Sequence, residues 1–181
     1  MSDLKFLIVD EKSKLFDTTG MFYKEFESDF RQIRYYTLLI VQKAPLEIRE
    51  INLLSQQISE LIKNAVKHGN NCEQKKLVKV WYSFTTEKAH LIVEDEGEGF
   101  KDLEKWNEFN KKREECFQNQ NYEEMEKYIS FRTKKSDEYD GGNAMFAAVE
   151  FWNGGVIFNN KKNRISVLKT YQKKRRGIEI E

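Results

Sequence analysis

Three polar residues with helical spacing, Glu60, Asn64 and His68, are the strongest candidates for chemistry in this sequence. Residues four apart lie nearly above one another on an α-helix, so these side chains are expected to form one polar stripe. A carboxylate and a carboxamide one turn apart can accept a proton from an attacking hydroxyl and supply an oxygen to Mg²⁺, as phosphoryl transfer requires. Taken alone, the stripe could equally be an ordinary solvent-facing helix surface. An apolar face beside it favours an amphipathic helix: Ile51, Leu54, Ile58, Leu61, Ile62 and Ala65.

A second motif, Val93-Glu-Asp95-Glu-Gly97-Glu-Gly99-Phe100, directly follows a predicted strand. The Asp95 carboxylate could accept an amino N–H from a nucleobase, and the glycines would let the backbone pass close to a ligand. An ordinary turn at the end of a strand is the alternative. The position of a third fingerprint glycine holds Asp102, which argues against a Rossmann dinucleotide site.

A third motif, Gly141-Gly142-Asn143-Ala144-Met145, stands at a predicted helix start. Free backbone N–H groups and the positive end of a helix dipole favour an anion there, although a glycine linker would have the same composition. The sequence holds no Walker loop and no H-R-D or D-F-G signature, so phosphates would not be bound as in P-loop or eukaryotic-type kinases. His90 lies on a predicted strand, where we expect it to be packed or surface-exposed rather than to ligate a metal with His68.

The hydrophobic periodicity predicts an α+β fold, a two-layer sandwich with helices packed on one face of a mixed β-sheet. The single proline, Pro45, suits the first turn of a helix, and Gly69-Asn70-Asn71 suits a helix end. The expected elements, in order, are a strand at 5–9, a helix over 22–43, a long helix from about 46 to 68, strands at 77–84 and 90–94, two short amphipathic helices within 101–135, a helix over 144–152, and a hairpin of 156–158 with 164–170.

Length and composition predict one domain over residues 1–181 with a solvated basic tail at 172–181. The 31 basic and 30 acidic side chains nearly cancel, which argues against direct nucleic-acid binding. The N-terminus has only a short apolar run around Phe6 to Val9, too short for a signal peptide or a membrane span. A cytoplasmic protein without membrane contact, and with its two cysteines reduced, is therefore expected.

Two of these motifs resemble those of a known superfamily. Glu60-Leu-Ile-Lys-Asn64-Ala-Val-Lys-His68-Gly69 is similar to the N-box, and Glu94-Asp95-Glu-Gly97-Glu-Gly99-Phe100 to the first glycine box, of the ATPases that include gyrase B, MutL and the histidine-kinase ATP-binding domain. The short chain and the direct run from one box to the other most resemble the anti-sigma factor serine kinases. The resemblance covers roughly residues 20–171.

The resemblance implies the histidine-kinase-like ATPase fold, with ATP and Mg²⁺ as cofactors. It implies Glu60 as general base, Asn64 as Mg²⁺ ligand and Asp95 as the reader of adenine. His68, Gly97, Gly99 and Phe100 would border the nucleotide, and the second glycine box would hold its phosphates through Gly141, Gly142, Asn143, Ala144 and Met145.

The implied function is that of a protein serine/threonine kinase that phosphorylates an anti-sigma factor antagonist protein, regulates transcription by partner switching with a sigma factor, and could form a homodimer. The sequence departs from the family pattern in three places. Ala144 replaces the last glycine of the second box, no threonine is placed near adenine because Thr170 comes too late, and the 101–135 insert is long. The insert could be a lid or a docking element, with Trp106, Phe109, Tyr122 and Met125 either facing a partner or packing on the body. Two alternatives therefore stay open: a nucleotide-sensing module without transferase activity, and a stand-alone histidine-kinase catalytic domain acting in trans.

Overall fold

The computed structural model describes residues 5–49, 52–133 and 142–172, which form a six-stranded mixed sheet with helices. Its strand order is β1-β5-β6-β4-β3-β2, with β1 parallel to β5 and all other neighbours antiparallel. The strands are β1 (Ile8–Val9), β2 (Phe22–Glu27), β3 (Leu77–Phe84), β4 (Lys88–Glu94), β5 (Gly155–Phe158) and β6 (Arg164–Thr170). The helices are α1 (Ile33–Val41), α2 (Leu46–Arg49), α3 (Asn52–Asn64), α4 (Leu103–Gln118), α5 (Tyr122–Met125) and α6 (Ala144–Phe151).

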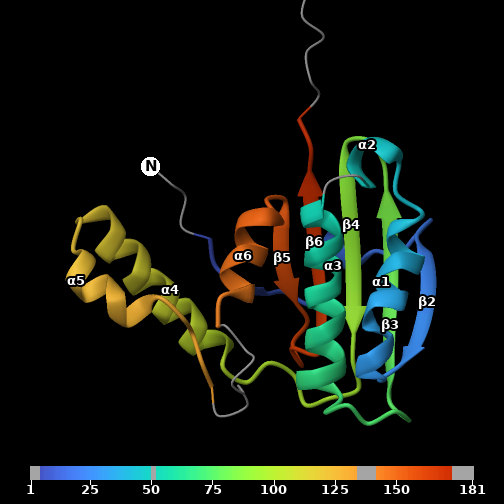
Figure 1. The fold of residues 1–181 in the computed structure, drawn as a ribbon, viewed down its shortest axis with the longest axis horizontal. Coiled ribbons are helices and arrows are strands. Elements are labelled where there is room, and N and C mark those ends of the chain that lie inside the picture. The colour runs from blue at the N-terminus through green and yellow to red at the C-terminus, as the bar shows by residue number, and fades with distance from the viewer. Residues whose placement is uncertain (1–4, 50–51, 134–141, 173–181) are drawn as a thin grey trace, which may run out of the picture.

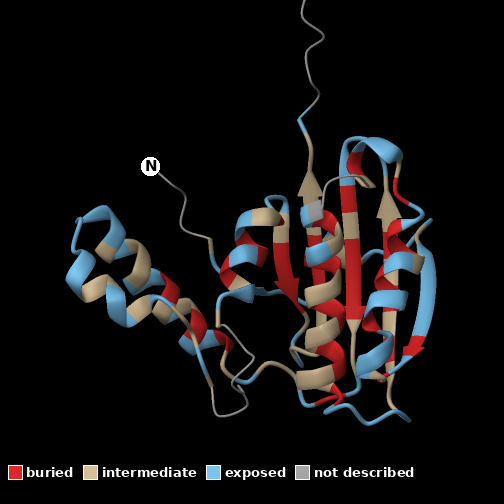
Figure 2. Cartoon of the chain, viewed as in Figure 1, coloured by how far each residue is buried: buried red, intermediate tan, exposed pale blue. Residues whose placement is uncertain are grey.

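Helices α1, α3 and α6 lie side by side over one face of the sheet (Figure 1). Alternate strand residues face this layer because side chains alternate along a strand, and Val80, Leu91 and Val167 are fully buried there. The apolar stripes of the helices pack against these strand residues, and Ile40 and Ile58 of the stripes are also fully buried. Figure 2 shows this buried seam between the two layers. The predicted two-layer α+β architecture is therefore confirmed.

The prediction of one helix over 22–43 is wrong in its first part. Residues Phe22–Glu27 form the edge strand β2, which pairs with β3, and the helix α1 starts only at Ile33. Phe22 and Phe26 fit a helical spacing, but they also fit the alternation of a strand. Asp29 ends the strand by accepting a hydrogen bond from the backbone N–H of Arg31, which opens a short 3₁₀ turn before α1.

The long second helix is found as α2 and α3, with residues 50–51 outside the described part of the chain. A π-helical turn, Ala65–Gly69, extends α3, and Asn71 and Cys72 follow with positive φ angles of 53° and 56°. The predicted stop after His68 is thus confirmed. A π turn shifts the side chains that follow it around the helix axis, and such turns recur at functional sites.

The insert holds one long helix, α4, and the single turn α5, whereas two short amphipathic helices were predicted. The α4–α5 hairpin extends away from the sheet (Figure 1), but the first half of α4 packs against the rest of the fold. Trp106 is 1 % exposed and Phe109 packs edge-on against Phe131, whereas Tyr122 is 59 % exposed. A partner-facing role is therefore wrong for Trp106 and stays a prediction for Tyr122.

None of the described helices is long and apolar enough to cross a membrane.

Two asparagines of α4 fasten the N-terminal segment. The Leu7 N–H donates to Asn107 Oδ1 (2.8 Å), Asn107 Nδ2 donates to the Leu7 carbonyl (2.9 Å), and Asn110 Nδ2 donates to the carbonyl of Lys5 (2.9 Å). Asn107 thus pairs with Leu7 as a neighbouring strand would. These bonds tie the first half of α4 to the residues just before strand β1. This part of the insert is therefore held in place and cannot swing as a lid would.

We predict that Asn107→Ala lowers the free energy of unfolding by about 2 kcal/mol, because both polar backbone groups of the buried Leu7 lose these partners. Urea denaturation measures the loss, and hydrogen exchange at the Leu7 amide should accelerate. Asn119→Ala is the matched control, since Asn119 is an exposed residue at the end of α4. Equal stability of the two variants would contradict the anchoring role.

Candidate functional site

A cavity of about 1480 Å³ opens between α3, the first turn of α6 and the segment that joins β4 to α4. Its floor is formed by core-facing residues of the sheet, Val93, Phe158 and Ile165. This volume exceeds the ~300–1,000 Å³ of most small-molecule pockets, so a nucleotide has room. The predicted site residues that line it are Glu60, Asn64, His68, Asp95, Gly99, Phe100, Gly142, Asn143, Ala144 and Met145.

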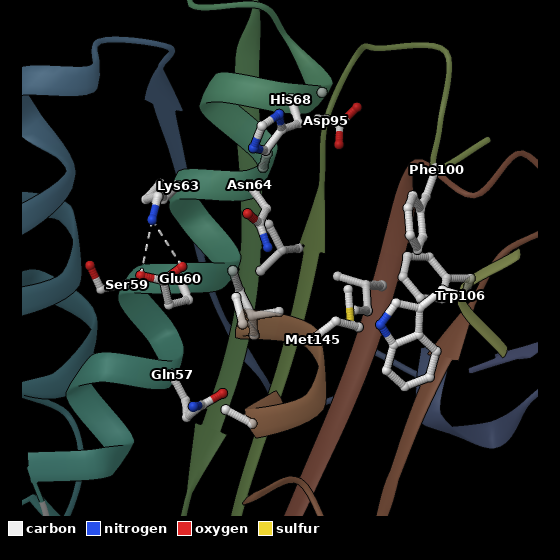
Figure 3. Close-up of a pocket in the computed structure, with 18 of the residues that line it drawn as sticks. Gln57, Ser59, Glu60, Lys63, Asn64, His68, Asp95, Phe100, Trp106 and Met145 are labelled. Atoms are coloured by element: carbon white, nitrogen blue, oxygen red, sulfur yellow. Dashed lines mark hydrogen bonds and ion pairs between the residues drawn. The ribbon is translucent and has the colours of Figure 1, made fainter. Parts of the chain in front are cut away.

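The polar stripe of α3 stands on one wall of the cavity (Figure 3). Leu54, Ile58 and Ile62 are fully buried against the sheet, which fixes the rotation of the helix. Glu60, Asn64 and His68 consequently follow one another along the edge that borders the cavity. Gln57 extends the stripe by one turn and is 7 % exposed. Gln57 was not among the predicted residues, although its position three residues before Glu60 places it on the same helix face.

Lys63 forms an ion pair with Glu60. Its Nζ lies 3.1 Å and 3.2 Å from the two carboxylate oxygens, and both side chains are partly exposed at 28 % and 37 %. Figure 3 shows this pair on the Ser59 side of α3, one turn from the Asn64 carboxamide. Lys63 was not among the predicted residues.

Asp95 lies at the other end of the stripe and is enclosed by backbone. The Gly97 N–H donates to Asp95 Oδ1 (2.8 Å), and Asn163 Nδ2 donates to the Asp95 carbonyl (2.6 Å). A Cβ atom on Gly69 would lie 2.3 Å from the Asp95 carboxylate, and one on Gly97 would lie 2.2 Å from the Gly69 carbonyl oxygen. Both positions therefore need glycine because α3 and the Asp95 loop approach so closely. Gly97 is behind Asp95 and does not line the cavity, and Gly141 lies outside the described residues.

Asn70 does more than end the helix, which is the role that its sequence context predicts. It is fully buried, and its side chain joins three segments. Asn70 Nδ2 donates to Ser28 Oγ (2.8 Å) and to the Leu77 carbonyl (3.0 Å), while its Oδ1 accepts from the Glu96 N–H (2.8 Å). The end of the α3 extension is thereby tied to the loop that carries Asp95.

We predict that Asn70→Ala lowers the free energy of unfolding by about 2 kcal/mol, because the buried Ser28 hydroxyl and two partly buried backbone groups lose their partner. Thermal and urea denaturation measure the effect. Asn160→Ala serves as control, since Asn160 is exposed and bonds Glu11 through its backbone N–H. A loss no larger than that of the control would show that the network does not support the loop.

The cavity carries an excess of positive charge. Of the described residues that line it, six are basic and three are acidic: Arg34, Lys63, Lys101, Lys105, Arg132 and Lys162 against Glu60, Asp95 and Asp102. Several of these cations already have carboxylate partners, as in the 2.9 Å pair of Lys105 with Asp102. The surplus favours an anionic ligand. No sequence motif predicts that these basic residues lie together, because they come from five separate segments of the chain.

A preformed metal cage is not found, since no group of three or more His, Cys, Asp or Glu side chains among the described residues is arranged to hold an ion. Mg²⁺ commonly binds through one or two protein oxygens together with water and substrate phosphates, and Asn64 and Glu60 could supply such oxygens. His90 lies outside the cavity, on the opposite face of the sheet. Its Nε2 is 2.9 Å from the Leu15 carbonyl, and burial lowers the pKa of its imidazole.

Thr170 also lies away from the cavity, where its backbone N–H donates to Asn153 Oδ1 (2.9 Å). The residue of β6 that lines the cavity is the apolar Ile165.

Comparison with known proteins gives one family. The family model described as the histidine kinase-like ATPase domain matches residues 27–129, which is more than half of the chain. No curated protein matches the sequence.

Proposed function

The chain belongs to the histidine kinase-like ATPase domain family, and we propose that its cavity binds ATP with Mg²⁺ and transfers the γ-phosphoryl group to a serine or threonine of a small antagonist protein. The observation that carries the proposal is the arrangement of α3 and the Asp95 loop on one cavity. The Asp95 carboxylate stands at one end of the polar stripe, and the Glu60 carboxylate stands at the other, one turn from the Asn64 carboxamide.

Asp95 suits the recognition of adenine. Its Oδ1 is held by the Gly97 N–H, and the backbone around it leaves no space for side chains at Gly69 and Gly97. A carboxylate so fixed can accept a hydrogen bond from the exocyclic amino group of adenine, whereas guanine presents an oxygen there. We therefore expect ATP to bind more tightly than GTP.

The phosphates would lie between Asn64 and the first turn of α6. Gly142, Asn143 and Ala144 line the cavity where that helix begins, and the N–H groups of a first helical turn, which have no partner within the helix, suit an anion. The surplus of basic side chains supports the same placement. Mg²⁺, held by the Asn64 oxygen, would neutralise the phosphate charge, and Glu60 would take the proton of the attacking hydroxyl.

The second candidate is a nucleotide-sensing module that binds ATP without transferring its phosphoryl group. Two observations favour it. Ala144 stands where the family pattern has glycine, and both oxygens of Glu60 are engaged by Lys63. Such a module would bind ATP with the same residues and leave every protein partner unphosphorylated.

Calorimetric titration of the wild type with ATP, in the presence and absence of Mg²⁺, tests the shared part of both candidates. Saturable binding that Mg²⁺ strengthens is expected, with GTP binding at least about tenfold more weakly. Incubation with ATP and a candidate antagonist, followed by mass spectrometry of its serine and threonine residues, then separates kinase from sensor. Absence of ATP binding would overturn the proposal altogether.

A further inference from the structure

The indole of Trp106 has a polar group that the fold leaves unsatisfied. Trp106 is 1 % exposed, yet its Nε1–H has no hydrogen-bond partner among the described residues. Buried tryptophan N–H groups usually find an acceptor, and a donor buried without one lowers stability. An unsatisfied group of this kind calls for an explanation, such as an acceptor that only a ligand supplies.

The position of Trp106 suggests what that acceptor is. The residue lines the cavity from α4, and Figure 3 shows the nitrogen edge of its ring turned toward Met145 and the polar stripe of α3. The ring also packs against Phe146, with the two ring centroids 5.0 Å apart. Phe146 belongs to the first turn of α6, so the indole stands beside the helix start that would hold phosphates.

We propose that Trp106 is a ligand-binding residue whose Nε1–H donates a hydrogen bond to an oxygen of the phosphate chain of the bound nucleotide. The inference rests on the proposed ATP site and adds to it a contact from the insert. It gives α4 a role in ligand recognition: the helix that Asn107 and Asn110 fasten to the N-terminal segment also presents a donor to the cavity.

The donor is covered in this structure, so a ligand oxygen reaches it after a neighbouring side chain turns aside. Met145 lines the same part of the cavity, is only partly buried and has three rotatable bonds. Rotation of the Met145 side chain would make room for a charged acceptor beside the nitrogen edge of the indole. Hydrogen bonds to charged acceptors are the stronger class, so the contact is expected to contribute measurably to affinity.

Trp106→Phe tests the contact, because phenylalanine keeps an aromatic ring and removes the N–H. We expect affinity for ATP and ADP to fall about tenfold, while affinity for adenosine, which lacks phosphates, stays within about twofold. Trp152→Phe is the matched control. Trp152 is also 1 % exposed, and its Nε1–H finds no acceptor in the described part of the chain, but it does not line the cavity. Its replacement should leave all three affinities unchanged.

Each outcome has a separate meaning. If the wild type binds no ATP, the proposed function fails before the inference is reached. If Trp106→Phe binds ATP as the wild type does, the hydrogen bond does not exist. If adenosine binding falls as much as ATP binding, the acceptor is not on the phosphates, and the assignment is wrong.

Nuclear magnetic resonance of the wild-type indoles gives a second reading that does not depend on the folding of a variant. The chain has three tryptophans, and their Nε1–H signals can be assigned with the Trp152→Phe and Trp81→Phe variants. We expect ATP to shift the Trp106 signal downfield and to slow its exchange with solvent, and adenosine to do neither. An unmoved Trp106 signal at saturating ATP would overturn the inference.

Discussion

Replacing Asp95 by asparagine should weaken ATP binding about 100-fold while leaving the protein folded. The asparagine side chain would still offer an oxygen to the Gly97 N–H, which now donates to Asp95 Oδ1 at 2.8 Å, so the loop keeps its local support. The remaining atom of the group changes from an acceptor to an amide donor. That donor would face the amino group of adenine, and two donors repel each other.

Net charge alone predicts the opposite result. The substitution removes a negative charge from a cavity that receives an anion, and this should strengthen ATP binding slightly. Asp102→Asn provides the comparison, because Asp102 lines the same cavity and forms a 2.9 Å ion pair with Lys105. Calorimetry with ATP should show a large loss for Asp95→Asn and little change for Asp102→Asn. Similar affinities in the two variants would exclude Asp95 as the reader of the base.

The residues around Asp95 show which parts of the site local sequence can predict. Glu60, Asn64 and His68 share a helix face because their spacing matches the helical repeat, and the structure places all three on the cavity. Gly69 and Gly97 come from different motifs, and their need for close approach is visible only when α3 and the loop are brought together. The types of the residues could be predicted, but the contact between them could not.

The predictions that failed, and the site residues that were not predicted, all depend on contacts between segments remote in the sequence. The edge strand β2 was assigned to a helix because Phe22 and Phe26 satisfy both periodicities, and its true partner, β3, is remote in the sequence. Asn70 looked like a helix terminator, yet its side chain joins Ser28, Leu77 and the Glu96 N–H across the fold. The cations of the cavity are scattered through a chain that is rich in lysine, so no local pattern distinguished them. Strand pairing decided the first case, non-local hydrogen bonds decided the second, and the packing of distant segments around one cavity decided the third.

Replacing Glu60 by glutamine should reduce phosphoryl transfer about 10²- to 10⁴-fold, the usual contribution of a general base, and leave ATP affinity within about threefold. Glutamine has nearly the same shape and fits the same partly exposed position, but it cannot take the proton of the attacking hydroxyl. Single-turnover measurement with the antagonist protein, or of the slower hydrolysis in which water replaces the hydroxyl, reports the chemical step directly.

The Glu60–Lys63 ion pair makes a second variant necessary, since Glu60→Gln also releases the Lys63 ammonium that now lies 3.1 Å from the carboxylate. Lys63→Gln breaks the same pair and keeps the carboxylate. If Glu60 is the base, Lys63→Gln should retain transfer within about tenfold of the wild type, because an ion pair this exposed contributes little to stability. An equal loss in both variants would instead assign the effect to the pair, and transfer that survives Glu60→Gln with unchanged ATP affinity would leave positioning and charge neutralisation as the whole of the catalysis.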